Sequence, residues 1–199
     1  MEEKVKQAWD NFLDPTKLRA SLIVFSLFIT ALEMLKDSIT ERPKELFFNG
    51  FDKGKWIVDE EKYKAEVLSL NRSPVYASLE WFKKMGAIDE NDISIFTELK
   101  EFRNEIAHKM HRLITEGAQK DPIPLFKNLS ELLNKLEKWW IREIEIPTNP
   151  DFDGQEVNDE AIEPGKSIAI NMLLNIALGS EEESTLYYKE YLKLLKNAN

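Results

Sequence analysis

Runs of apolar residues at helical spacing dominate the chain. The longest run covers residues 15–39 and contains the nearly continuous apolar segment 20–35, which predicts a helix buried on most of its sides. Asp14 followed by Pro15 is typical of a helix start. Pro43 is expected to end this helix, because the residue before a proline disfavours the helical conformation.

A second stripe marks a long helix in the middle of the chain. Its apolar residues recur at steps of four, three, four, four and three: Ile95, Leu99, Phe102, Ile106, Met110 and Leu113. This period predicts one helix with a single buried face. Asp89 is expected to begin the helix and Gly117 to end it. The opposite, outward side then carries Lys100, Asn104, His108 and His111, with Arg103 on the flank.

The remaining patterns complete an all-α prediction. Further helices are expected at residues 1–14, 59–70, 75–85, 124–146, 167–178 and 184–197. Residues 45–58 break the helical period with two short aromatic or β-branched runs, which predicts a small β-hairpin. We expect a helical bundle over residues 1–146, an acidic loop over 147–166, and C-terminal helices over 167–199 docked on the same domain.

Charge and residue composition exclude several classes of protein. The net charge of −9, from 27 Lys and Arg against 36 Asp and Glu, argues against a broad surface for duplex DNA. The absence of Cys excludes disulfides and thiolate zinc sites. No signal peptide is predicted, and segment 20–35 is shorter than the ~20 residues that span a bilayer. We therefore expect a cytoplasmic protein with no membrane span.

Arg103, Asn104 and His108 are the candidate chemical groups of the central helix. Histidine titrates near neutral pH and can move the 2′-hydroxyl proton of RNA. Arginine can stabilise a pentavalent phosphorane through its planar fork, and Asn104 can orient either group. Because Arg103 and His108 are ~140° apart around a straight helix, they could act together only through a helix distortion or across two chains.

The segment R-N-E-I-A-H, preceded by L-K-E-F, resembles the R-x(4–6)-H motif of the HEPN superfamily. The resemblance implies an all-helical bundle that dimerises so that two motifs line one cleft. It implies a metal-independent endoribonuclease, without cofactor, of the toxin–antitoxin or phage-defence type, with RNA as substrate and an antitoxin or activating protein as a possible partner. The catalytic positions fall on Arg103, Asn104 and His108. The nearby cationic strip of Lys100, Lys109, His111 and Arg112 is expected to bind RNA.

One feature of the sequence departs from the HEPN pattern. HEPN toxins paired with nucleotidyltransferase antitoxins usually carry a Tyr two residues after the His, and that position is Met110 here. Silencing by modification of that Tyr is therefore not expected. In addition, the early F-S-L-F-I-T-A-L-E helix is loosely similar to the mannitol-operon repressor family, which is regulatory. The alternative function is a non-catalytic helical regulatory or interaction protein.

Structural roles compete with the chemical ones. Arg103 could form an ion pair with Glu98, Glu101 or a neighbouring helix, and His108 could be an ordinary surface imidazole. The spacing of His108 and His111 could suit a metal, but no third ligand is evident.

The acidic loop partly matches the sequence pattern of an EF-hand calcium site. Positions 1, 3, 5, 6 and 12 of an EF-hand loop would be taken by Asn149, Asp151, Asp153, Gly154 and Glu160. Pro150 at position 2 and Glu156 at position 8 depart from that pattern, so a solvated loop is the alternative.

Overall fold

The protein is an all-α bundle with one small hairpin. The structure is a computed structural model that describes residues 2–117, 120–155 and 157–197. The main helices are α1 (Glu2–Leu13), α2 (Pro15–Glu45), α3 (Glu60–Glu66), α4 (Pro74–Lys84), α5 (Glu90–Glu116), α6 (Pro122–Trp140), α8 (Gly165–Leu178) and α9 (Glu181–Asn197). The expected fold class is confirmed.

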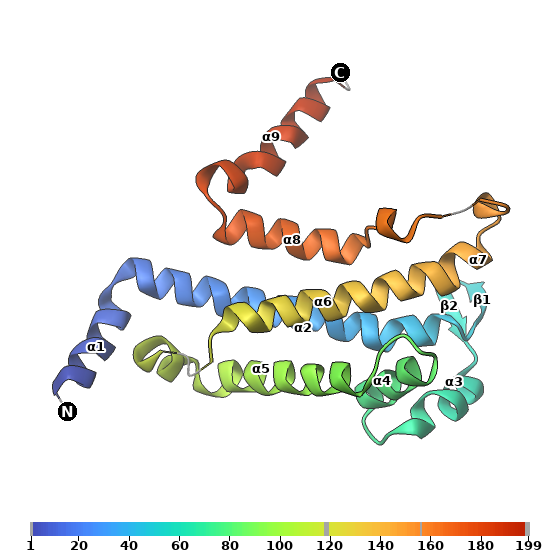
Figure 1. Cartoon of the computed structure of the whole chain (residues 1–199), viewed down its shortest axis with the longest axis horizontal. Helices are drawn as coiled ribbons and strands as arrows, with labels where there is room; N and C mark the ends of the chain where they lie inside the picture. The colour runs from blue at the N-terminus through green and yellow to red at the C-terminus, as the bar shows by residue number, and fades with distance from the viewer. Residues whose placement is uncertain (1, 118–119, 156, 198–199) are drawn as a thin grey trace.

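Helix α2 is the centre of the bundle. It packs against α4, α5 and α6, and Figure 1 shows α2, α5 and α6 running side by side along the long axis. The Phe28 ring lies edge-on to Phe102 of α5 and to Phe126 of α6, with centroids 4.8 and 5.2 Å apart. Such edge-to-face pairs add to the free energy gained by burying the rings. They join the three helices at one point.

Helix α2 also has the length and mean hydropathy of a membrane-crossing helix. Its side chains at Phe25, Phe28, Leu32, Leu35 and Ile39 are nevertheless buried within the bundle. A core helix of this kind passes the same test of length and composition. Leu22 and Ile23, nearer the start of the helix, are each 40% exposed, so the neighbouring helices cover only part of the apolar surface of α2.

The prediction that Pro43 ends this helix is wrong. Pro43 lies inside α2, which continues to Glu45. Pro43 is buried, and the preceding Arg42 is held by an ion pair to Glu137 of α6. These tertiary contacts offset the hydrogen bond that a proline cannot donate near the helix end.

Helix α5 has the predicted caps and buried face. The Asp89 side chain accepts a hydrogen bond from the Asp92 N–H, and the Asp92 side chain accepts one from the Asp89 N–H. This reciprocal capping box stabilises the first turn. Gly117 follows the last turn with φ of 85°, which suits glycine. Leu99, Phe102, Ile106 and Leu113 are buried, whereas Ile95 and Met110 are partly buried.

The backbone of α5 is not regular throughout. Lys109 has φ of −131° and ψ of 20°, so the helix is kinked directly after His108.

The hairpin forms where it was expected. Strand β1 (Phe48–Asp52) pairs antiparallel with β2 (Lys55–Val58). The turn is made by Lys53 and Gly54, which both have positive φ. The rings of Phe48 and Trp56 stack across the strands at 5.3 Å between centroids. This stacking fixes the register on one side of the hairpin.

The C-terminal part continues from α6. A π-helical turn (Ile141–Glu145) and the short α7 (Ile146–Thr148) extend α6. Short 3₁₀ turns at Pro150–Phe152 and Asp159–Ala161 lie within the acidic loop. Helix α8 packs against α6 and α2, and α9 packs against α8. Figure 1 shows α9 pointing away from the bundle.

Helix α1 packs against α5 and α2. The side chain of Asn11 donates a hydrogen bond to the Thr115 carbonyl, at 2.9 Å. The apolar side chains of Trp9, Phe12 and Leu13 are exposed. The apolar side of α1 thus stays largely uncovered.

Candidate functional site

The candidate motif lies on the second half of α5. Arg103 and Asn104 are partly buried, and His108 is exposed. None of the three belongs to the buried core, because the Leu99–Phe102–Ile106 stripe turns the other side of the helix inward. The apolar period correctly keeps all three residues out of the core, but Asn104 is partly buried and not on the open outer side of the helix.

Arg103 is held by a residue of another helix. Its Nη2 lies 3.3 Å from Glu33 Oε1 on α2, and its Nη1 donates a 3.4 Å hydrogen bond to Asn104 Oδ1. The side chains of Arg103 and Glu33 remain 38% and 39% exposed. The ion pair to a neighbouring helix, one of the structural alternatives for Arg103, is therefore present.

Glu33 is shared between two cations. Lys36 Nζ lies 2.9 Å from Glu33 Oε2. The hydrogen bond from Lys36 lowers the pKa of Glu33 below its ordinary value, the charges of Lys36 and Arg103 act in the same direction, and partial burial opposes them. Glu33 is thus held ionised between Lys36 and Arg103.

A cavity of about 270 Å³ opens beside Arg103, between α2, the start of α4 and α5. Its polar lining comes from Glu33, Lys36, Ser73, Lys100, Arg103 and Asn104. Lys100 Nζ lies over the Tyr76 ring, 4.8 Å from its centroid. Two of the three motif residues and one predicted RNA contact therefore meet at one hollow.

His108 lies outside this cavity. The helix is regular from Arg103 to His108, and its kink comes only at Lys109. The distortion therefore leaves the two side chains on different sides of the helix. Within the described residues, His108 makes no hydrogen bond or ion pair. A single chain does not bring Arg103 and His108 together.

The predicted cationic strip divides in two. Lys100 lines the cavity beside Arg103, whereas Lys109 and Arg112 line a separate cavity of about 690 Å³ between α1 and α5. That second cavity also has Glu105 and Glu116 in its lining. His111 is exposed.

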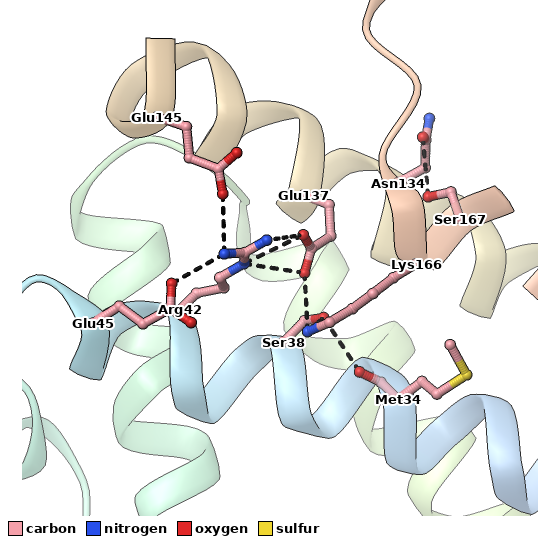
Figure 2. Close-up of polar contacts among 9 residues, drawn as sticks. All are labelled: Met34, Ser38, Arg42, Glu45, Asn134, Glu137, Glu145, Lys166 and Ser167. Carbon is pink, nitrogen blue, oxygen red and sulfur yellow. Dashed lines mark hydrogen bonds and ion pairs between the residues drawn. The ribbon is translucent and has the colours of Figure 1, made fainter. Parts of the chain in front are cut away.

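A buried ionic cluster was not anticipated from the sequence. Figure 2 shows Arg42 of α2 reaching Glu137 of α6, at 2.7 Å between Nη2 and Oε2. Arg42 Nη1 also lies 3.0 Å from both Glu45 and Glu145. Lys166 of α8 lies 3.3 Å from Glu137 and donates a 2.8 Å hydrogen bond to Ser38. The cluster joins α2, α6 and α8.

Glu137 is the most buried member of this cluster, with a side chain 2% exposed. Burial raises its pKa, but hydrogen bonds from Arg42 and Ser38 and the charges of Arg42 and Lys166 outweigh burial, so the pKa of Glu137 is lowered. A sequence signal existed. Glu137 follows Leu133 by four and precedes Trp140 by three, so it falls on the buried face of α6.

No metal site is formed within residues 2–117, 120–155 and 157–197, where no three His, Cys, Asp or Glu side chains gather suitably. In the acidic loop, Asn149 Oδ1 accepts the Asp151 N–H, and Asp159 pairs with Arg142 at 3.1 Å. Glu156 lies outside the described residues. Asn149 and Asp159 are thus used in a local turn and in a contact to the π-helical turn.

Comparison with known proteins gives no match to a protein-family model, to a curated protein or to a solved structure.

Proposed function

We propose that the protein is a metal-independent endoribonuclease of HEPN type that cleaves RNA at a composite site between two copies of the chain. The observation that carries the proposal is the placement of Arg103, Asn104 and His108 outside the core of an all-α bundle, on one helix. The guanidinium of Arg103 and the imidazole of His108 lie on different sides of α5, so the proposal brings them to one phosphate by packing two copies of the chain.

The chemistry follows from these residue types. Neutral His108 of one copy takes the proton of the RNA 2′-hydroxyl, and the 2′-oxygen attacks the adjacent phosphorus. Protonated His108 of the partner subunit donates a proton to the leaving 5′-oxygen, so the P–O5′ bond breaks and a cyclic phosphate remains. Arg103 stabilises the extra negative charge on the phosphorane, and Asn104 holds the Arg103 guanidinium in place.

The placement of Arg103 and His108 supports a two-copy arrangement. Arg103 and His108 point to different sides of one helix. One chain is therefore poorly arranged to bring an acid, a base and a guanidinium to the same phosphate. Two antiparallel faces place one acid and one base on opposite sides of the phosphate. The reaction needs no cofactor, and the proposed setting is a cytoplasmic toxin or phage-defence protein restrained or activated by a partner protein.

The test is RNA cleavage by the purified protein in EDTA. We expect cleavage by the wild type and losses of at least about 10²-fold in His108→Ala and Arg103→Ala, as is typical for a general acid–base group or a charge-stabilising group. Arg19→Ala, an exposed cation on α2, is the matched control and should retain activity. Intact RNA with wild-type protein, or equal cleavage by His108→Ala, contradicts the proposal.

A second function is a non-catalytic helical interaction protein. Two observations favour it: Arg103 already has a structural partner in Glu33, and α8 and α9 expose large apolar side chains, Ile176, Leu178, Tyr188, Tyr191 and Leu194 among them. Large apolar patches on a protein surface commonly mark interaction sites.

Expression phenotypes separate the two functions. For the interaction protein, Arg103→Ala and His108→Ala leave any growth phenotype of induction intact, whereas Tyr191→Asp abolishes it. For the ribonuclease, Arg103→Ala and His108→Ala abolish the growth phenotype, whereas Tyr191→Asp leaves it intact.

A further inference from the structure

The charge of the cavity beside Arg103 is opposite in sign to the net charge of the whole protein. The chain as a whole carries a net charge of −9, yet the cavity lining contains three cations, Lys36, Lys100 and Arg103, against one carboxylate, Glu33. A concave surface lined by one sign of charge concentrates the field within it. The cavity therefore attracts anions although the whole molecule repels them.

The three cations differ in how far they are neutralised. Lys36 and Arg103 both pair with Glu33, at 2.9 and 3.3 Å. Lys100 contacts the Tyr76 ring, and within the described part of the chain it pairs with no carboxylate. Glu33 thus serves as the anion for two of the cations, and a net charge of about +2 remains for a ligand.

The neutral groups suit the same ligand. The Asn104 amide and Ser73, which precedes α4, complete the polar lining. Hydroxyl, amide, ammonium and guanidinium groups are the common donors to phosphate oxygens in nucleic-acid complexes. At about 270 Å³, the cavity is smaller than pockets for drug-sized ligands, which begin at about 300 Å³. Its size favours a single phosphate group.

We infer that this cavity binds one phosphate group of the RNA backbone, adjacent to the cleavage site; the RNA assignment rests on the proposed function. Lys36 and Lys100 supply point charges to this phosphate, and Arg103 lies beside it at the scissile phosphate, where the proposed reaction uses its guanidinium. Glu33 occupies part of the same position in the free protein, so it competes with the phosphate. This makes Glu33 a determinant of affinity, with an effect opposite in sign to that of the cations.

The experiment measures binding of two probes by titration calorimetry: inorganic phosphate, and a single-stranded RNA oligonucleotide with 2′-O-methyl groups that cannot be cleaved. Lys100→Ala and Lys36→Ala should each weaken the binding of both probes about tenfold, the usual effect of losing a charge-assisted contact. Glu33→Gln should tighten the binding of both probes several-fold. Lys100→Ala should also reduce the slope of log affinity against log salt for the oligonucleotide by about 0.7.

Helix α2 supplies a matched control. Lys44 and Glu41 form another i,i+3 ion pair on the same helix, and neither residue lines the cavity. Lys44→Ala and Glu41→Gln change the net charge as Lys36→Ala and Glu33→Gln do, but should leave both affinities unchanged. Circular dichroism checks that each variant is folded, and Lys36→Gln replaces Lys36→Ala where helix content falls.

The outcomes are separable. Absence of phosphate binding, or equal effects of Glu33→Gln and Glu41→Gln, overturns the cavity as an anion site. Phosphate binding without oligonucleotide binding supports the anion site but overturns its assignment to the RNA backbone. Binding of both probes with the expected variant effects supports the inference even where natural RNA stays intact, in which case the proposed catalysis fails by itself.

Discussion

Charged residues in buried positions determine much of this structure at the scale of single side chains. Glu137 is almost fully desolvated and contacts cations from two other helices, Arg42 and Lys166. Arg42 also lies over the Trp140 ring, 5.4 Å from its centroid. The net contribution of a buried ion pair to stability is small, but removing one partner leaves the other charge buried and unpaired. The cluster is therefore sensitive to single substitutions.

Glu137→Ala is expected to lower the free energy of unfolding by about 3 kcal/mol, the lower end of the range for breaking a buried pair. The lower end applies because Arg42 retains Glu45 and Glu145 as partners. Glu131→Ala removes a carboxylate of an exposed pair with Lys127 on the same helix and should cost less than about 1 kcal/mol. Urea unfolding measures both. Equal losses in the two variants would show that the ionic cluster contributes no more to stability than an exposed ion pair does.

Acid should destabilise the protein partly through Glu137. Its pKa is lowered in the folded state, so its contribution is fully present above the unfolded pKa of about 4.3 and is lost as pH falls through the lower folded pKa. We expect the free energy of unfolding to decline below about pH 4.3, and less steeply in Glu137→Gln. Urea unfolding between pH 7 and pH 3 measures this. Parallel curves for wild type and Glu137→Gln would contradict it, and Glu131→Gln provides the control.

At the scale of elements, the buried face and both ends of α5 follow from local sequence, and the sequence predicted them well. The stripe from Leu99 to Leu113 fixed the inward face of α5, and Asp89 and Gly117 fixed its ends. The kink at Lys109 was missed because the surrounding residues include neither Pro nor Gly, the usual sources of kinks. The end of α2 was misplaced because the contacts of Arg42 outweigh the local preference around Pro43.

Asp89→Ala tests the capping box of α5. Loss of the side-chain acceptor for the Asp92 N–H should cost about 1 kcal/mol of unfolding free energy. Asn91→Ala, exposed in the same turn, should change it by less than about 0.5 kcal/mol. Thermal and urea unfolding measure both variants. An unaffected Asp89→Ala protein would mean that tertiary packing alone sets this helix start.

At the scale of the whole molecule, the partners of residues distant in sequence could not be predicted. The motif Arg103-Asn104 was found, but its contact with Glu33 depends on how α2 packs against α5. The fold class, by contrast, follows from repeated apolar stripes, each of which is local. The sequence therefore located the candidate residues, and only the three-dimensional packing showed that Arg103 and His108 lie apart in one chain.

The C-terminal helices should contribute unequally to stability. Removing residues 181–199 is expected to change the unfolding free energy of the bundle by less than about 1 kcal/mol, because the side chains of α9 that would be lost are largely exposed. Removing residues 165–199 also deletes buried Ile170 and the Lys166 contact to Glu137 and should cost about 3 kcal/mol or more. Urea unfolding of the two truncated proteins tests this difference; equal losses would contradict it.

The π-helical turn at Ile141–Glu145 makes the protein sensitive to chain length at this point. Such a turn holds one residue more than an α-helical turn, and its last residue, Glu145, contacts Arg42. Deleting a single residue here would restore a regular helix and rotate everything beyond it by about 100°. Glu145 would then lose its place beside Arg42. This part of the chain tolerates substitution better than a change in the number of its residues.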